Sequence, residues 1–478
     1  MITIINYKSG NIGSVTNALD KIGAKYIVTA DPTMIKKASK VIFPGVGRAG
    51  QAMPELKKLK LEQLIQDIRA PFLGICLGMQ LLLSYSEEDN TKCLDIIDGK
   101  VKKFPKKNNL VVPQIGWNQV KQIKNEPLFK NIPNNSYFYF VNSYYCDPLK
   151  KNIIGQTQYG SNFASVIKKN NFYGVQFHPE KSGELGQKML KNFCDIEALE
   201  NSATIPSERK ASPIRFEQEL TALKSAKSLL AKRIIACMDI KNNKVVKGTN
   251  YKQLKDAGDP VKLAQLYDKM GIDELMFLDI TATIEKRRLL YKLVEKIAKN
   301  ITIPFSVGGG IKTLNDIYQL LLSGADKVSI GSAAVTNPDL VKKAAQRFGS
   351  QCIVISLDPK KNRNSWEIYI NSGKKATGID ALKFAKKMET LGAGELLVNS
   401  IDRDGTKKGY DLDLLRNIAK KVNIPIIASS GAGKKKDFLD ALTKGQADAA
   451  LAATLFHKQK LKITDLKNYL KNHGISIR

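Results

Sequence analysis

The C-terminal half of the chain repeats one unit, a short apolar strand followed by a helical stretch, eight times. Neighbouring parallel strands need a crossover connection, which is usually a helix. Eight such units in succession therefore predict a closed (β/α)₈ barrel, the TIM-barrel architecture, over residues 231–478. The strand segments are RIIACMD, ELMFLD, PFSVGG, KVSIGS, IVISLD, ELLVNS, PIIASS and ADAALAAT.

The predicted barrel also contains an internal repeat. The segment that begins at Pro304 matches the one that begins at Pro425, and Ser332 then aligns with Thr454 after one inserted residue. Self-similarity at this scale indicates that one structural unit occurs twice. The sequence therefore predicts two half-barrels that arose by duplication.

Residues 1–197 show a different pattern. The segments MITIINY, VIFPGVG and PFLGICLG are apolar runs ending in glycine or polar turns, which is typical of buried strands in an open α/β sheet. Residues 198–230 begin with the polar, turn-rich NSATIPSERKASP and continue with a stretch at helical spacing. We interpret this segment as a linker whose last part is helical.

Composition narrows the class of protein. No apolar run is long enough to cross a bilayer, and the N-terminus enters a strand without a presequence. Six cysteines without a CxxC pair indicate free thiols, which favours the cytoplasm. The net charge of +31 comes mostly from scattered lysines, without the aromatic interleaving of a nucleic-acid-binding surface. We therefore expect a lysine-rich solvated surface, no nucleic-acid partner and no membrane partner.

A cysteine between two glycines carries the chemistry of the first domain. Gly74-Ile75-Cys76-Leu77-Gly78 follows a buried strand, and such glycines permit the sharp turn that exposes a nucleophile. Taken alone, this pattern also fits a buried structural cysteine. His178, one of only three histidines, lies two residues before Glu180 in FHPE, so both can face Cys76 from an extended segment. The joint pattern predicts a Cys-His-Glu triad.

The motifs GICLGMQ and FHPE resemble those of class I glutamine amidotransferases, across nearly all of residues 1–195. The resemblance implies that Cys76 attacks the carboxamide of glutamine and that His178 protonates the departing ammonia and then activates water. It implies an oxyanion site at the amide of Leu77 and the loop Gly45-Val46-Gly47. It also implies that Gln80 and Glu88 bind glutamine. YKSGNI, PGVG and PQIGWN narrow the resemblance to the glutaminases of the imidazole glycerol phosphate synthase family, with departures at Gln114 and Asn142, where that family often has histidine.

Aspartates lie at the ends of several predicted barrel strands, where such barrels carry their sites. Asp239 and Asp358 end the first and fifth strands, so they should face each other across the mouth and suit acid–base work. Metal ligation or a solvated turn is the alternative, but no histidine accompanies them. Glycine and small hydroxyl residues follow strands three, four, seven and eight. They predict two phosphate nests, and hence a substrate with a phosphate at each end.

Residues 231–478 resemble the cyclase of the imidazole glycerol phosphate synthase family in AKRIIACMDIKNNKVVKG, VGGGI, SIDRDGTKKGYD and ASSGAGK. The resemblance implies that phosphoribulosyl-formimino-AICAR phosphate and ammonia give imidazole glycerol phosphate and AICAR, with no cofactor or metal. Asp239 and Asp358 are then the acid–base pair, and Lys247 lies on a mobile loop over the substrate. Two positions depart from the family pattern. The family often has asparagine where this chain has Gly331, and usually has glycine where it has Ser430. The substrate- and phosphate-binding residues that the resemblance implies, besides Lys247, are Asp279, Gly310, Gly331, Ser332, Asp404, Gly405, Gly431, Ala453 and Thr454.

Four charged residues stand at the starts of strands one, two, four and six: Arg233, Glu274, Lys327 and Glu395. They should share the bottom face of the barrel, where charges usually serve stability. The family resemblance implies that they form a gate for ammonia, and the two interpretations are compatible.

Two other functions are alternatives to an imidazole glycerol phosphate synthase. An amidotransferase-coupled synthase of the pyridoxal phosphate type would need a Schiff-base lysine where this chain has aspartates. A basic nucleic-acid-binding protein built on inactive enzyme domains would not need the triad and both aspartates.

Overall fold

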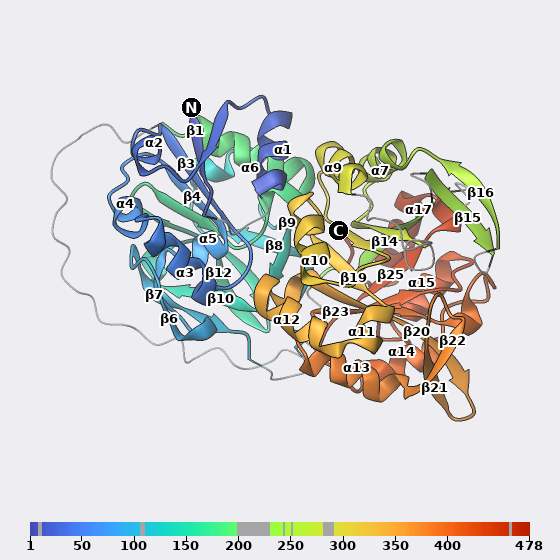
Figure 1. Ribbon diagram of the computed structural model, residues 1–478. Helices are drawn as coiled ribbons and strands as arrows, with labels where there is room; N and C mark the ends of the chain where they lie inside the picture. Colours follow the sequence, from blue (N-terminus) through green and yellow to red (C-terminus); the bar gives the residue numbers. More distant parts are fainter. Residues whose placement is uncertain are drawn as a thin grey trace.

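The computed structural model describes residues 1–7, 12–105, 110–197, 230–241, 244–249, 252–280, 291–457 and 461–478. One large β-sheet lies in the N-terminal part of the chain and another in the C-terminal part, and the two parts lie side by side (Figure 1). The linker predicted at 198–230, with its helical end, lies outside the described residues except for Leu230.

The N-terminal sheet is parallel where its strands alternate with helices. β1 (Ile2–Ile5), β3 (Lys40–Gly45), β4 (Phe72–Cys76) and β13 (Phe172–Val175) are parallel neighbours in that order. The carboxyl ends of β4 and β13 therefore meet at one edge of the sheet, which confirms the predicted α/β class. The helices are α1 (Ile12–Lys21), α2 (Pro32–Lys36), α3 (Ala49–Lys58), α4 (Glu62–Gln66), α5 (Leu77–Gln80) and α6 (Gly183–Asp195). The other strands are β2 (Tyr26–Thr29), β5 (Leu83–Ser86), β6 (Thr91–Lys92), β7 (Ile97–Lys103), β10 (Tyr144–Pro148), β11 (Ile153–Tyr159) and β12 (Ser161–Lys169).

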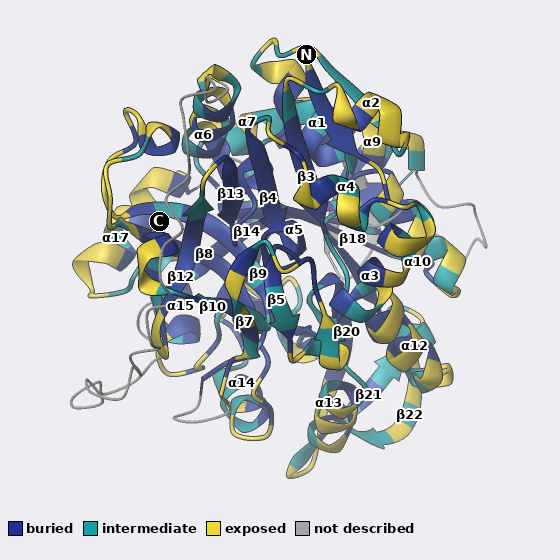
Figure 2. Cartoon of the chain, turned by 90° about the vertical axis from the view of Figure 1, so that its left-hand side faces the viewer, coloured by how far each residue is buried: buried dark blue, intermediate teal, exposed yellow. Residues whose placement is uncertain are grey.

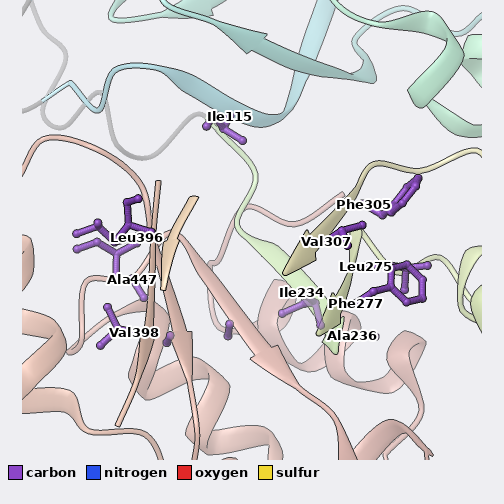
Figure 3. Close-up of a cluster of buried hydrophobic side chains, with 14 of the residues drawn as sticks. Ile115, Ile234, Ala236, Leu275, Phe277, Phe305, Val307, Leu396, Val398 and Ala447 are labelled. Carbon is purple, nitrogen blue, oxygen red and sulfur yellow. The ribbon is translucent and has the colours of Figure 1, made fainter. Parts of the chain in front are cut away.

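Two further strands bring this sheet against the barrel. β8 (Gln114–Gln122) and β9 (Ser136–Asn142) pair antiparallel, with Trp117 opposite Tyr139. Ile115, Trp117 and Tyr139 are buried in the same hydrophobic cluster as the barrel side chains, and Figure 3 shows Ile115 at its edge. A continuous apolar core between the two parts holds them in a fixed relation.

The C-terminal sheet closes on itself. Its eight parallel strands follow one another in chain order, and β14 also pairs with β25, with Arg233 opposite Ala449. This confirms the predicted (β/α)₈ barrel. The barrel strands are β14 (Arg233–Lys241), β17 (Glu274–Asp279), β18 (Phe305–Gly308), β19 (Lys327–Ile330), β20 (Ile353–Asn362), β23 (Glu395–Asn399), β24 (Ile426–Ser429) and β25 (Ala449–Ala452). The helices are α7 (Pro260–Lys269), α9 (Tyr291–Asn300), α10 (Leu314–Leu322), α11 (Ser332–Thr336), α12 (Pro338–Phe348), α13 (Ala381–Thr390), α14 (Leu412–Ala419), α15 (Lys435–Leu442), α16 (Thr454–His457) and α17 (Ile463–Asn472).

Strands one and five are longer than the sequence pattern predicts. β14 continues into a hairpin of β15 (Lys244–Thr249) and β16 (Lys252–Gly258), and β20 continues into β21 (Ser365–Ile370) and β22 (Lys375–Asp380). Asp239 and Asp358 therefore lie inside their strands instead of ending them. Antiparallel pairing beyond the barrel rim is the physical reason for this difference, because it supplies backbone partners past the mouth.

The two segments of the predicted internal repeat share a hydrogen-bond pattern. Asp316 of α10 accepts hydrogen bonds from the amides of Lys312 and Thr313 at 3.0 and 2.9 Å. Asp437 of α15 accepts them from Gly433 and Lys434 at 2.8 and 2.9 Å. The same helix start thus follows β18 and β24. Figure 2 shows the central strands of the molecule buried and the outer faces of the helices exposed.

Candidate active sites

Cys76 lies at a strained turn between β4 and α5. Its φ of +53° and ψ of −107° are a conformation that non-glycine residues rarely adopt. The flanking glycines permit this turn because they allow backbone segments to touch. A Cβ on Gly78 would lie 2.0 Å from the oxygen of Phe43, and one on Gly74 would lie 2.6 Å from the oxygen of Gly78. Strain held in this way is typical of a nucleophile elbow.

His178 and Glu180 follow β13 and lie at the same sheet edge as Cys76. The Nδ1 of His178 is 2.8 Å from Oε1 of Glu180, and both side chains are buried. Burial by itself would lower the pKa of His178, but the charges of Cys76 and Glu180 and hydrogen bonds to both outweigh it. They raise the pKa of His178 well above its usual value. The structure therefore brings the three predicted triad residues together and favours an imidazolium beside the sulfur.

The loop Gly45-Val46-Gly47 runs beside the backbone of the elbow. Gly45 is the register partner of Cys76, and a Cβ on Gly45 would lie 2.7 Å from the amide nitrogen of Gly78. Gly47 has a φ of +111°, which glycine adopts readily. The loop predicted to supply an oxyanion donor thus adjoins Leu77, which is predicted to supply the other.

Gln80 ends α5, directly after the elbow, and Glu88 begins the short turn Glu88–Asn90. The Nε2 of Gln80 donates to the oxygen of Tyr144 at 3.1 Å and to Oε1 of Gln176 at 3.0 Å. Glu88 accepts a hydrogen bond from the amide of Ala49 at 3.1 Å. Burial raises the pKa of Glu88 to about 7, although the Ala49 amide and then Arg48 act in the opposite direction.

Sequence reasoning missed Gln176. Its Nε2 is 3.7 Å from the Sγ of Cys76. The available signal was its position two residues before His178, because residues at even spacing share one face of an extended segment.

The predicted aspartates of the barrel lie near the C-terminal ends of opposite strands. Asp239 is in β14 and Asp358 in β20, the first and fifth strands. The Nδ2 of Asn399 donates to Oδ1 of Asp358 at 3.0 Å and to Oγ of Ser356 at 2.9 Å. Loss of hydration raises the pKa of Asp358 to about 6, against the Asn399 hydrogen bond, and Asp404 adds to the increase. A carboxyl that titrates near neutrality is suited to proton transfer.

The predicted phosphate residues follow the strand ends, and several need glycine. Gly310, Gly405 and Gly431 have φ values of +73°, +70° and +102°, in the left-handed region. Ser332 begins α11 and its Oγ accepts from the amide of Asn371 at 3.1 Å. Asp279 ends β17, Asp404 and Ala453 lie past β23 and β25, and Thr454 begins α16.

Three positions differ from expectation in informative ways. Ser430 has a φ of +73°, which explains why glycine suits this position. Gly331 has a φ of −101°, and an added Cβ would meet only Ser356, at 3.7 Å, so there is space for a side chain at this position. Lys247, expected on a loop, lies in β15 of the first hairpin, because antiparallel pairing with β16 orders this segment as a strand.

A closed ring of ion pairs fills the opposite face of the barrel. Lys327 Nζ is 2.5 Å from Glu274 and 2.7 Å from Glu395, while Arg233 is 2.7 Å from Glu274 and also pairs with Glu395. All four side chains are at most 1% exposed. Burial alone would raise the pKa of Glu274, but the charges of Lys327 and Arg233 lower it. Two positive and two negative charges compensate one another, as buried charges must.

The N-terminal part covers this face of the barrel. Lys181, three residues after His178, pairs with Asp326 of the barrel at 2.9 Å, and the side-chain nitrogen of Trp117 donates to the oxygen of Asp273 at 3.1 Å. Burial and the charge of Glu274 raise the pKa of the buried Tyr139 hydroxyl well above its usual value. The triad and the ring of ion pairs therefore adjoin the same interface.

Among the described residues, no cluster of histidine, cysteine or carboxylate side chains could hold a metal ion. No helix in the described part of the chain is long and apolar enough to cross a membrane.

Comparisons with known proteins find matches for both parts of the chain. A family model described as glutamine amidotransferase class-I matches residues 3–196, and one described as histidine biosynthesis protein matches residues 233–462. The imidazole glycerol phosphate synthase subunit HisF of Natranaerobius thermophilus is 54% identical over 250 residues, which are 52% of this chain and 100% of that protein. The HisF subunits of Dehalococcoides mccartyi strain BAV1 and Clostridium botulinum strain Okra are each 52% identical, over 99% and 100% of their lengths and 52% of this chain. The chain therefore belongs to the imidazole glycerol phosphate synthase family and joins a class I glutamine amidotransferase region to a HisF barrel.

Proposed function

We propose that the chain couples two reactions of histidine biosynthesis, with a glutaminase in residues 1–197, a linker at 198–230 and a cyclase in residues 231–478. Cys76 attacks the carboxamide of L-glutamine, the amides of Leu77 and Val46 bind the oxyanion, and a γ-glutamyl thioester forms. His178, oriented by Glu180, donates a proton to the departing ammonia and then activates water. Its raised pKa supports the first of these steps, because a protonated imidazole is the donor that ammonia needs.

Ammonia then passes through the ring of ion pairs into the barrel. Arg233, Glu274, Lys327 and Glu395 close the barrel on the side that the glutaminase covers. The barrel interior beyond them is lined by apolar side chains such as Ile235, Met276, Val354 and Leu397, which bind no protons and present no charge to ammonia. A path enclosed by protein keeps ammonia from protonation by water.

In the barrel mouth, ammonia attacks the ribulosyl carbonyl of phosphoribulosyl-formimino-AICAR phosphate, and cyclisation and cleavage give imidazole glycerol phosphate and AICAR. Asp239 and Asp358 exchange the protons that these steps require. The two phosphates bind at the glycine-rich turns that follow β18 and β19, and β24 and β25, with Asp279, Asp404 and Lys247 as further contacts. A pyridoxal phosphate type synthase is not favoured, since aspartates occupy these strands and the relatives are HisF proteins.

The observation that carries this proposal is the ring of ion pairs at an interface that also adjoins the triad. The test supplies glutamine labelled with ¹⁵N in its amide, unlabelled ammonium and the bisphosphate substrate, and measures glutamate, AICAR and label in imidazole glycerol phosphate. We expect equal amounts of glutamate and AICAR and label undiluted by external ammonium. Full dilution of the label would contradict transfer through the barrel.

A bisphosphate analogue that binds the barrel without reacting should increase glutamine hydrolysis. The oxyanion loop can present the amide of Val46 after rotation of the Gly45–Val46 peptide, which the glycines on either side make easy. One oxyanion donor is worth roughly 10²–10³ in rate, so we expect stimulation of up to that order. Glutaminase rates with and without the analogue measure it. Equal rates, with binding of the analogue shown by calorimetry, would exclude this coupling between the sites.

The KM for glutamine should depend on the ionisation of Glu88. The charged carboxylate would bind the ammonium group of glutamine, and its pKa of about 7 means that protonation removes this charge at lower pH. We expect a KM about tenfold higher at pH 6 than at pH 8. Glu88→Gln should give a high KM that no longer varies in this range. A wild-type KM that is constant from pH 6 to 8 would contradict the assignment.

Removing the hydrogen bond from Asn399 should shift the pH dependence of cyclisation. That bond lowers the pKa of Asp358, so Asn399→Ala raises the pKa above its value of about 6. The acidic limb of the ammonium-dependent kcat/KM should then move to higher pH, with activity largely recovered at alkaline pH. Asn417→Ala serves as the control, since Nδ2 of Asn417 donates to the oxygen of Asp413 within α14. An unmoved limb in folded Asn399→Ala would show that Asp358 does not set it.

A further inference from the structure

Gln176 is fully buried directly beside the predicted nucleophile. Its backbone N–H and both polar atoms of its side chain have hydrogen-bond partners. It is 0% exposed, and its backbone amide nitrogen donates to the backbone oxygen of Ser165 at 2.9 Å. Its side chain connects two functional positions, because Nε2 lies 3.7 Å from Sγ of Cys76 and Oε1 accepts from Nε2 of Gln80 at 3.0 Å.

The sheet itself places Gln176 at this level. β4 and β13 are parallel neighbours with Ile75 opposite Val175, so the next residue on each strand is Cys76 and Gln176. Because one strand carries the nucleophile and the other carries the side chain against it, no loop movement is needed to bring them together.

The hydrogen bonds also fix which end of each amide faces the sulfur. The oxygen of Tyr144 can only accept, so the group of Gln80 at 3.1 Å from it must be the NH₂ group. That same nitrogen contacts Gln176, whose facing atom must then be the oxygen. The NH₂ group of Gln176 is therefore turned toward Cys76. Asn142 belongs to the same hydrogen-bond network, since its Nδ2 also donates to the backbone oxygen of Tyr144, at 2.9 Å.

We propose that Gln176 is a positioning residue of the glutaminase, whose N–H donation holds the Cys76 sulfur for attack and connects it through Gln80 to the backbone of Tyr144. This inference rests on the proposed glutaminase reaction. A donor aimed at sulfur stabilises the thiolate over the thiol, and it restricts the rotation of a side chain that already lies at a strained turn.

The test compares two substitutions in the full-length chain. Gln176→Met keeps the length of the side chain and removes both polar ends. Gln176→Glu is isosteric, keeps an acceptor for Gln80 and removes the donor to sulfur. Gln122→Met is the matched control, because the Nε2 of Gln122 donates to the oxygen of Ile132 at 2.8 Å in the same domain, outside this cluster.

We expect the glutaminase kcat to fall about 10- to 100-fold in both Gln176 variants, the range for a hydrogen bond to a charged group. The KM for glutamine should change less than about threefold in Gln176→Glu, because this variant keeps the acceptor for Gln80. The rate of Cys76 alkylation by iodoacetamide should fall at pH 7 and its pH profile should move to higher pH, more strongly with Gln176→Glu. A merely structural role would not move that profile.

Near-ultraviolet circular dichroism of the same variants reports folding, and if Gln176→Met is not folded, Gln176→Glu decides. A folded variant with wild-type hydrolysis and a wild-type alkylation profile would overturn the inference. Its failure is distinguishable from failure of the proposed function. If the wild-type chain does not hydrolyse glutamine, the glutaminase assignment is wrong, whereas an active wild type and an inactive Cys76→Ala with fully active Gln176 variants contradict only the role of Gln176.

Discussion

Cys76→Ala is expected to abolish glutamine-dependent formation of imidazole glycerol phosphate while cyclisation with added ammonium salts continues. The substitution removes the sulfur that forms the thioester, and loss of a catalytic nucleophile reduces turnover by at least about 10³-fold. The barrel aspartates and the ring of ion pairs lie on separate elements and are untouched. Parallel assays of AICAR release with glutamine and with ammonium chloride measure the two activities.

The control for this experiment is Cys194→Ala, which alters a half-buried cysteine on α6 of the same domain. It should retain both activities. Loss of ammonium-dependent cyclisation in folded Cys76→Ala would contradict the division of labour between the two sites. Retained glutaminase activity would show that Cys76 is not the nucleophile.

The barrel could be predicted because its signal is local and repeated. Each strand carries its own apolar run, and each helix its own periodicity, so no knowledge of distant contacts is needed. The ring of ion pairs was predictable for the same reason. Once the strands are assigned, the first residues of β14, β17, β19 and β23 must share one end of the barrel, and the structure finds them paired there.

The sharp turn at Cys76 could be predicted, but the contacts that require its glycines could not. A glycine on each side of Cys76 indicated a sharp turn, and the turn is present. The glycines are required by contacts with Phe43 and with each other, and the unusual φ belongs to Cys76. A close approach between β3 and the start of α5 depends on sheet order, which the local pattern does not contain.

The roles of Gln176 and Asn399 could not be predicted from the sequence either. Each is a neutral amide whose role depends on the reactive side chain next to it, Cys76 in one case and Asp358 in the other. Amides are common in strands and loops, so the residue type carries little information by itself. The hairpins that extend β14 and β20 were also missed, although Trp366, Ile368 and Ile370 form a buried face that alternates along β21.

Asp239→Asn should reduce cyclisation by at least about 10²-fold with either glutamine or ammonium as the nitrogen source. Asparagine keeps the volume of the side chain on β14 but cannot exchange a proton, so binding should survive while kcat falls. Asp358→Asn should also impair the reaction, though less. The measurement is kcat for AICAR release at saturating bisphosphate substrate, with Asp413→Asn as control, since Asp413 is an exposed residue of α14 whose partner is Arg416.

Glutamine hydrolysis stimulated by bound substrate should persist in Asp239→Asn, because the glutaminase responds to binding and not to turnover. Near-normal AICAR release by this variant would refute the acid–base assignment, and loss of substrate binding would move Asp239 from proton transfer to recognition.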